Sequence, residues 1–350
     1  MRRGFGSDNH SGVHPRLLKA IELCNIDHAP SYGTDVVSER CLDIFRQHFG
    51  AQTSAYFVFN GSAANILALK TLVRPWQSVL CTDIAHIFVD ECAGPEVVGG
   101  MKLWPIPSNI EGKLTVEALE ENFIRRGDQH FAQAAAISIT QPTELGTVYS
   151  LDELNAICSW AKSKKLYIHV DGARFAGACS YLGVSFKSLS TDLGVDVLSF
   201  GGTKNGFLFG EAVLILNPEL DAPVRYIRKH MGQLPSKSRF IAAQFEAYLR
   251  DNLWKEIAEH THKMALRLAD STRSIPGVSI RCPVQTNAVF ATIPRPWIAP
   301  LRKEFFFYVW NEKTFESRWM CSWDTTEEDI DNFAKTLRRI SDEIPPNELS

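Results

Sequence analysis

The stretch "AAAISITQPTELGTVYSLDELNAICSWAKSKKLYIHVD" (residues 134–171) decides the fold class of this chain. It begins with an apolar strand at 134–140 and ends with a second strand at 166–171. Residues 150–165 have helical spacing, and Ser150 with Glu153 forms the capping-box pattern that starts a helix. A strand, a helix and a second strand in this order are typical of a parallel βαβ unit.

The same alternation extends to both sides, from about residue 55 to 215, and predicts a mostly parallel sheet covered by helices on both faces. The further strands that we expect are "AYFVFNG" (55–61), "SVLCTD" (78–83), "DVLSF" (196–200) and "EAVLIL" (211–216). The further helices are "SAANILALKTL" (62–72) and "LTVEALEENFIRR" (114–126).

The alternation of strands and helices ends near residue 235, where a long helical pattern begins. This pattern is interrupted at Asp251-Asn252. We therefore predict a large domain at 1–240 and a smaller α+β domain at 241–350. The elements expected in the second domain are the helix at 238–275, strands within 287–293, 304–310 and 317–323, and a helix at 326–344. The Pro-rich "TIPRPWIAP" (292–300) is predicted to be a loop.

Composition and charge restrict the class of protein. The 350 residues have a net charge of −3, which gives no support for binding to nucleic acid or to an anionic membrane. The eight cysteines contain no CxxC pair, so we expect reduced thiols in a cytoplasmic protein. The N-terminus has no apolar signal region, and no apolar run approaches the ~20 residues of a membrane span.

Ligands of open α/β sheets bind at the carboxyl ends of the strands, and a first candidate site there is "FNGSAAN" (59–65). Gly61, Ser62 and Ala63 lie where a strand turns into a helix, so their backbone N–H groups could bind a phosphate. The alternative is an ordinary helix start in which Ser62 is the N-cap.

A second strand end is "YIHVDGARF" (167–175), where a buried strand ends in Asp171. A carboxylate there requires a cation nearby. The cation is either Arg174, in an internal ion pair, or a protonated heterocyclic nitrogen of a ligand.

Lys204 follows the strand "DVLSF" in a Gly-rich turn. It is a phosphate-loop lysine, a surface lysine or the covalent anchor of a cofactor. Burial and nearby cations would lower the pKa of its amine, as a nucleophile requires.

The stretch "TDIAHIFVDEC" (82–92) contains His86, Asp90 and Glu91. No second histidine lies nearby, so we predict no metal site. A histidine placed over a planar ligand is the better functional interpretation of His86. Together these candidates suit pyridoxal 5′-phosphate. The start of the helix at 62–72 would bind its phosphate and His86 would lie over its ring. Asp171 would pair with its pyridinium nitrogen, and Lys204 would bind its aldehyde.

With these residues identified, the chain resembles the low-specificity L-threonine aldolases. These belong to the β-eliminating lyases among the aspartate-aminotransferase-like (fold type I) enzymes that use pyridoxal phosphate. The motifs that carry the resemblance are "SDNHSG" (7–12), "FNGSAAN" (59–65), "AHIFVDECAGPE" (85–96), "ITQPTELGTVYSLDEL" (139–154), "HVDGARF" (169–175), "DVLSFGGTKNG" (196–206) and "RWMCSWDTTEEDI" (318–330). They run in order over nearly the whole chain.

The resemblance implies a role for each matching residue. Lys204 would form the Schiff base with the cofactor, Asp171 would pair with the ring nitrogen, and His86 would stack on the ring. Phosphate would be held by Gly61, Ser62 and Ala63. Arg174 would lie near the cofactor O3′ and the substrate carboxylate, which Ser7 and Arg318 would also hold. Residues 1–35 would lie at a subunit interface, and Tyr32 and Asp35 would form a turn near it. Lys229 would reach the site of the neighbouring subunit.

The resemblance also implies the reaction, which is cleavage of L-threonine or L-allo-threonine to glycine and acetaldehyde by a homodimer or homotetramer. Another branch of the family has a histidine where this chain has Thr143, so the base for the β-hydroxyl proton stays open between His86 and a water held by His86 or Glu91. The alternative functions are transamination or β-elimination on another amino acid, or a non-catalytic binding protein with the same fold.

Overall fold

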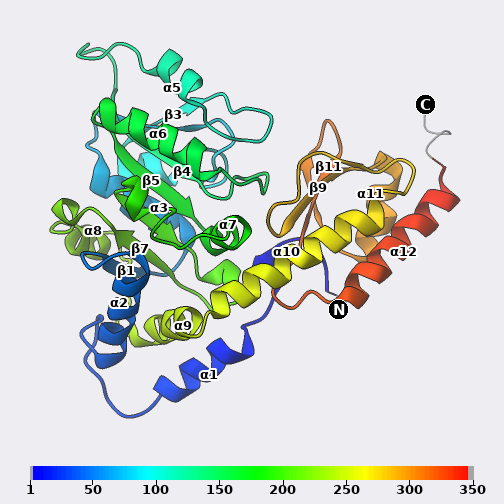
Figure 1. Ribbon diagram of the computed structural model, residues 1–350, viewed down its shortest axis with the longest axis horizontal. Helices are drawn as coiled ribbons and strands as arrows, with labels where there is room; N and C mark the ends of the chain where they lie inside the picture. The colour runs from blue at the N-terminus through cyan, green and yellow to red at the C-terminus, as the bar shows by residue number, and fades with distance from the viewer. Residues whose placement is uncertain (1–2, 346–350) are drawn as a thin grey trace.

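The computed structural model describes residues 3–345, which form two β-sheets joined by a long helix (Figure 1). The larger sheet has seven strands in the order β1-β7-β6-β5-β4-β2-β3. Their bounds are β1 (Ser54–Val58), β2 (Gln77–Thr82), β3 (Lys102–Ile106), β4 (Gln133–Thr140), β5 (Tyr167–Gly172), β6 (Val197–Phe200) and β7 (Glu211–Ile215). The pairs from β3 through β6 are parallel, and only β7 runs antiparallel to its neighbours, so the predicted mostly parallel sheet is confirmed.

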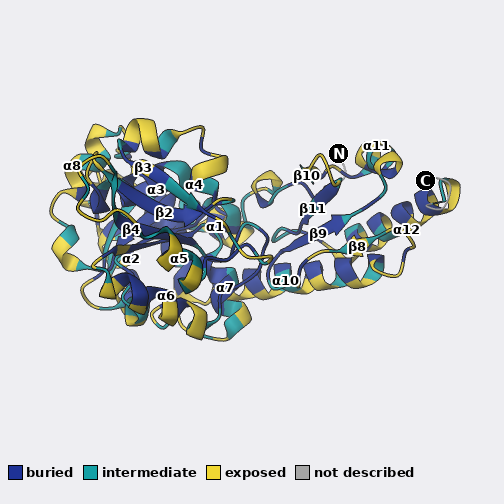
Figure 2. Ribbon diagram, turned by 90° about the horizontal axis from the view of Figure 1, so that it is seen from above, coloured by how far each residue is buried: buried dark blue, intermediate teal, exposed yellow. Residues whose placement is uncertain are grey.

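Both faces of this sheet are buried, which explains the long apolar runs in its central strands. In β6, Val197 faces one core and Leu198 faces the other. In β7, Val213 and Leu214 alternate in the same way. Figure 2 shows the strands buried and the outer sides of the helices exposed.

Helices cover the two faces. On one side α3 (Gly61–Leu72) packs against the sheet, and on the other lie α2 (Val36–Phe49), α6 (Leu151–Ser163) and α7 (Phe175–Leu182). The remaining helices of this part are α1 (Pro15–Cys24), α4 (His86–Val89), α5 (Val116–Asn122), α8 (Val224–His230) and α9 (Arg239–Arg250). The capping box predicted at Ser150 and Glu153 is present at the start of α6.

The smaller sheet is antiparallel, with the strand order β10-β11-β9-β8. Its strands are β8 (Ser279–Ile280), β9 (Ala288–Thr292), β10 (Tyr308–Asn311) and β11 (Glu316–Met320). The helices around it are α10 (Leu253–Thr272), α11 (Arg295–Glu304) and α12 (Glu327–Glu343). The predicted helix break is confirmed, because Asn252 has a φ of 54° between α9 and α10. The domain boundary at residue 240 stays a prediction, because α10 packs against α7 as well as α12.

The prediction of a loop at 292–300 is wrong, because α11 begins at Arg295. Pro296 lies in the first turn, where its missing N–H is not needed. Trp297 and Leu301 lie four residues apart on one face and are fully buried. Burial of this apolar face therefore outweighs the Pro-rich composition.

The N-terminal segment connects the two sheets. The Phe5 N–H donates to the Phe306 carbonyl at 2.7 Å, and the Met320 N–H donates to the Phe5 carbonyl at 2.9 Å. The Phe5 ring lies in the core of the smaller sheet, against Phe333. The next residues, a short 3₁₀ helix at Asp8–His10, reach the larger sheet. Within residues 3–345, no helix is long and apolar enough to span a bilayer.

Candidate functional site

A cavity of about 660 Å³ opens at the carboxyl ends of β4 and β5 and at the turn that follows β6. The smaller sheet supplies its far wall through residues of β10 and β11. The predicted site residues that line it are Ser7, Gly61, His86, Asp171, Arg174, Lys204 and Arg318. The fold thus brings together residues that are up to 311 positions apart in the chain.

Lys204 lies in a short 3₁₀ helix, Thr203–Asn205, that follows β6. The turn before it requires glycine, because a Cβ on Gly201 would lie 2.1 Å from the Ala173 carbonyl oxygen. The Asn205 side chain donates to the carbonyls of Ala173 and Gly201 at 3.2 and 2.9 Å and fixes the turn. Burial, followed by the charge of Arg174, lowers the pKa of Lys204. The neutral, nucleophilic form of the amine is therefore favoured.

Asp171 is the last residue but one of β5 and is 5% exposed. Its carboxylate accepts hydrogen bonds from the Asn65 side chain at 2.8 Å and from the Ala173 N–H at 3.1 Å. The hypothesis of an internal ion pair with Arg174 is wrong, because Arg174 pairs with Asp8 instead. Within the described residues 3–345, Asp171 has no ion-pair partner, so this buried carboxylate is available to a cationic ligand.

Asp8 is a residue that the sequence did not reveal as part of the site. It accepts two hydrogen bonds from the Arg174 guanidinium, at 2.6 and 2.9 Å, and a third from Asn287 at 3.1 Å. Burial by itself would raise the pKa of Asp8, but the charge and hydrogen bonds of Arg174 outweigh it, and the pKa is lowered. Arg174 is thus held in place by an ionised carboxylate.

His86 is the first residue of α4, and its Nδ1 lies 2.9 Å from Glu91 Oε1. This hydrogen bond raises the pKa of His86 despite partial burial of the ring. Asn65 donates to the same Glu91 oxygen at 2.8 Å. Because Asn65 also bonds Asp171, a continuous polar chain connects His86 with the end of β5.

The start of α3 has the free N–H groups that an anion site needs, but the alternative interpretation, with Ser62 as the N-cap, is wrong. Asn60, not Ser62, is the N-cap, and its side chain accepts from the Ala63 N–H at 2.9 Å. Gly61 and Ser62 are in the first turn, where N–H groups have no intrahelical partner. A Cβ on Gly61 would meet no atom within 4 Å, so this backbone faces open space in which a phosphate could bind.

Arg318 on β11 reaches the cavity from the smaller sheet. Its guanidinium donates to the Gly6 carbonyl at 3.2 Å and packs over the Trp310 ring, 4.7 Å from the centroid. Burial, followed by the charge of Arg174, lowers the pKa of Arg318 to about 10, so it remains cationic at neutral pH. Ser7 lies nearby as the N-cap of the Asp8–His10 turn and accepts from the Asn9 N–H at 3.2 Å.

Five of the predicted residues do not line this cavity: Ser62 and Ala63, which follow Gly61 in α3, and Lys229, Tyr32 and Asp35. The Lys229 ammonium lies 5.7 Å from the centroid of the Tyr32 ring. Tyr32 is 50% exposed, and Asp35 is the N-cap of α2, where it accepts from the Ser38 N–H at 2.9 Å. Within one protomer these residues do not line the cavity that contains Lys204.

Glu144 and Thr143 follow β4, and both line the cavity. The Thr143 hydroxyl is bonded to Thr147 Oγ1 at 2.6 Å. Glu144 Oε1 accepts from Thr140 Oγ1 at 2.7 Å and from the His86 N–H at 2.9 Å. Sequence reasoning missed Glu144, although its place just after a strand end was a usable signal.

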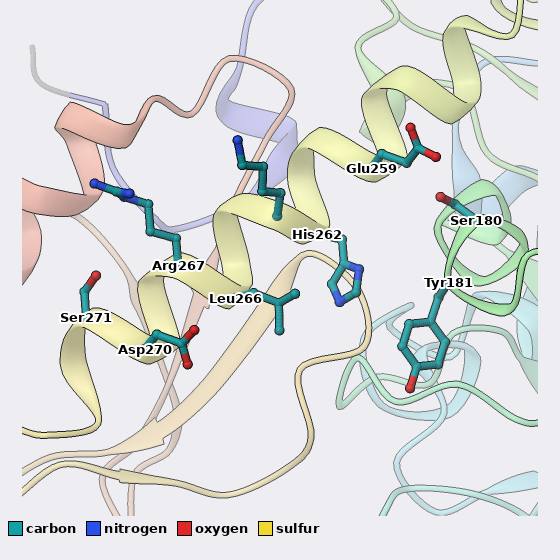
Figure 3. A pocket seen from close by; sticks show the side chains of 9 residues that line it. Ser180, Tyr181, Glu259, His262, Leu266, Arg267, Asp270 and Ser271 are labelled. Atoms are coloured by element: carbon teal, nitrogen blue, oxygen red, sulfur yellow. The ribbon is translucent and has the colours of Figure 1, made fainter.

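A second, wider groove of about 810 Å³ lies between α7 and α10 (Figure 3). In it, Tyr181 and His262 face each other with ring centroids 5.6 Å apart. His262 is already hydrogen-bonded to the Val284 carbonyl at 3.1 Å. None of the predicted site residues lines this groove, so the cavity at Lys204 is the better candidate.

Residues 4–295 match the model of a family described as "Beta-eliminating lyase". The chain belongs to the beta-eliminating lyase family. Among its relatives in this family, the "Low specificity L-threonine aldolase" of Pseudomonas aeruginosa is 41% identical over 341 residues, covering 96% of this chain and 97% of that protein. The "Alanine racemase TOXG" of Cochliobolus carbonum is 31% identical and covers 83% of this chain and 75% of its own length.

A solved structure of Leishmania major threonine aldolase has a TM-score of 0.91 and 29% identity, and covers 97% of this chain and 99% of its own. The family resemblance, the lyase class and the fold type I architecture expected from the sequence are therefore confirmed for this beta-eliminating lyase.

Proposed function

We propose that this beta-eliminating lyase is an aldolase that uses pyridoxal 5′-phosphate to cleave L-threonine and L-allo-threonine into glycine and acetaldehyde. The observation that carries the proposal is the presence, in one cavity, of a partly buried lysine of lowered pKa and a buried aspartate that has no ion-pair partner among the described residues. The identity of 41% to an L-threonine aldolase supports it.

The residues in the cavity fit this cofactor. A pyridinium nitrogen would supply the cation that Asp171 lacks, and the start of α3 would hold the phosphate at Gly61 and Ser62. The buried Oδ1 of Asn65 and Oε2 of Glu91 have no hydrogen-bond partner within residues 3–345, which favours a polar ligand beside them. Lys204 would bind the aldehyde carbon, and His86 would face the ring. When bound, the cofactor supplies an electron sink for the carbanion left at Cα.

The side chains of this protein then position the substrate and its protons. Asp171 favours the protonated ring nitrogen, since an anion nearby stabilises the charged form. Arg318, with Ser7, would hold the substrate carboxylate in a planar two-point contact. A carboxylate fixed in this way would set the orientation of the substrate and so would select the bond that breaks. Arg174, fixed by Asp8, would contact the cofactor O3′ and the same carboxylate.

We further propose that the active species is a homodimer or homotetramer in which Lys229 completes the site of the neighbouring subunit. Lys229 and Tyr32 lie on the surface near exposed apolar side chains, among them Phe59, Phe209 and Tyr226. Such exposed apolar groups favour a protein interface. All eight cysteines are unpaired, which supports a location in the cytoplasm.

The test is an absorbance spectrum of the purified protein with pyridoxal phosphate, before and after borohydride reduction. We expect a visible band that reduction fixes onto Lys204, and release of acetaldehyde from L-threonine. The Lys204→Ala variant should lose both, whereas Lys255→Ala, on the exposed side of α10, should keep both. A colourless protein, or an equal adduct in the Lys204→Ala variant, would overturn the assignment.

The 31% identity to an alanine racemase makes racemisation the second candidate. It would share Lys204 and Asp171 and differ in the product. Formation of D-alanine from L-alanine, without acetaldehyde from L-threonine, would favour the racemase. Glycine formed without a keto acid favours the aldolase over transamination.

A further inference from the structure

We propose that Glu144 is the general base that removes the β-hydroxyl proton of the amino-acid substrate. The inference rests on the proposed aldolase function and adds the residue that this reaction needs beyond the cofactor. A base is required because cleavage converts the β-hydroxyl into the carbonyl of the aldehyde.

The Glu144 carboxylate has one fixed oxygen and one free oxygen. Thr140 and the backbone N–H of His86 both donate to Oε1, at 2.7 and 2.9 Å. Oε2 is buried and has no hydrogen-bond partner within residues 3–345. A buried carboxylate oxygen without a partner is costly, and Glu144 lines the same cavity as Lys204. A substrate hydroxyl bound there would satisfy it.

The neighbours of Glu144 place it on the side of the cavity where the substrate is expected. Leu145, the next residue, packs in one cluster with Phe290 and Met320 of the smaller sheet. Phe290 lies directly opposite Arg318 in the pairing of β9 with β11. The loop that carries Glu144 therefore packs against the strands that carry Arg318, the proposed carboxylate contact. Glu91 instead bonds Asn65 and through it Asp171, toward the ring nitrogen.

The other candidates for the base are already occupied. His86 Nδ1 bonds Glu91, which raises the pKa of His86, so a larger fraction of the ring is already protonated near neutral pH and cannot accept another proton. The Thr143 hydroxyl is bonded to Thr147 and to the Glu111 carbonyl. Glu91 Oε2 is also unpartnered, but its carboxylate holds Asn65 and His86 in place.

Burial raises the pKa of Glu144 to about 7, which suits a group that must take and return a proton at neutral pH. The negative charge of Asp171 adds to this increase in the pKa of Glu144. The other charged and titratable groups around Glu144 are Arg174, His86, Tyr149 and Cys81.

The step balances without another reactant. The β-hydroxyl proton moves to Glu144 Oε2, and the O–H electron pair forms the C=O bond of the aldehyde. The Cα–Cβ bond breaks, and its electron pair takes up a proton from solvent at Cα to give glycine. Glu144 then releases its proton to solvent, so one proton is taken up and one is released in each turnover.

The experiment compares Glu144→Gln with the wild type in two reactions of the holoenzyme. The first is L-threonine cleavage; the second is exchange of the glycine α-proton with D₂O, followed by NMR. Exchange needs the cofactor, Lys204 and a base at Cα, but no β-hydroxyl chemistry. We expect kcat for cleavage to fall about a hundredfold while glycine exchange stays close to the wild-type rate. Glu144→Asp should restore part of the cleavage.

The pH profile provides a readout that a structural role would not change. In the wild type, kcat/KM for threonine should rise as pH increases through about 7, where Glu144 loses its proton, and Glu144→Gln should lack this limb. The control is Glu111→Gln, whose side chain is 40% exposed and pairs with Lys113.

Two results would overturn the inference: unchanged threonine cleavage in Glu144→Gln, or a loss of glycine exchange as large as the loss of cleavage. A wild type that exchanges glycine but releases no acetaldehyde would instead refute the aldolase function, and the inference with it.

Discussion

Arg174 and Asp8 form a two-point ion pair, with the Arg174 Nε and Nη2 atoms 2.6 and 2.9 Å from the two Asp8 oxygens. The pair connects the end of β5 with a segment that begins in the smaller sheet. It fixes Arg174 at the cavity wall and also fixes Ser7, the residue before Asp8. The N-terminal segment is thereby part of the candidate site.

Asp8→Asn should lower the free energy of unfolding by about 3 kcal/mol, because it leaves the Arg174 guanidinium without its buried partner. Urea unfolding of the apoprotein measures this. The pKa of Asp8 is lowered in the folded protein, so its contribution is present at neutral pH and is lost as pH falls through the folded value. The difference between variant and wild type should therefore shrink in acid.

The control for this prediction is Asp43→Asn. Asp43 pairs with Arg46 at 3.0 Å on the surface, where its side chain is 65% exposed. Exposed pairs contribute at most about 1 kcal/mol. An equal effect of the two substitutions would show that burial of the Asp8 pair is not what stabilises the protein.

Glu144→Gln should stabilise the apoprotein at pH 8 by about 3 kcal/mol, because the wild type must keep an ionised carboxylate in a buried place. The folded-state pKa is raised to about 7, so the stability of the wild type is greatest below the unfolded value of 4.5 and falls as pH rises through about 7. The gain should vanish at pH 4. Thermal unfolding at both pH values measures it, and a gain equal at both would contradict the raised pKa.

Arg318→Lys should raise KM for threonine about tenfold, which corresponds to one lost hydrogen bond of about 1.4 kcal/mol. Lysine keeps the charge but cannot make the planar two-point contact with a carboxylate. Steady-state kinetics of acetaldehyde release measures the change. Arg302→Lys, on the exposed side of α11, is the control, and a matching rise there would rule out a carboxylate contact at Arg318.

His169 should make the protein sensitive to acid. It lies between Ser138 Oγ and Ser199 Oγ, at 2.9 and 3.0 Å, and burial lowers its pKa to about 4. Because the unfolded state binds a proton near 6.5, this residue should remove about 3 kcal/mol of stability as pH falls from 7 to 4. His169→Gln should lose less stability over this range than the wild type. An identical pH dependence would contradict the prediction.

The sequence predicted the large sheet and much of the site because those signals are local. The apolar runs of the sequence predict that one strand ends at Asp171 and that another ends shortly before Lys204. The Asp8–Arg174 pair could not be read in this way, because its partners are 166 positions apart and only the tertiary fold brings them together. For the same reason, one of the two interpretations of Asp171 paired it with Arg174, its neighbour in the chain.

Two local predictions failed because competing signals were close in strength. At α3, Asn60 and Ser62 are both good N-caps, and Asn60 forms the cap. At α11, proline suggested a loop, whereas the buried Trp297 and Leu301 stabilise a helix. In both places the contacts made by neighbouring side chains decide the outcome.

The backbone partners of Phe5 are Phe306 and Met320, which are synthesised some three hundred residues later. The segment around Phe5 can therefore reach its native position only after Phe306 and Met320 have been synthesised. Until then Arg174 is without its carboxylate, and Ser7 is absent from the cavity. A nascent chain that ends before residue 318 lacks Arg318 and therefore lacks part of the wall of the candidate site.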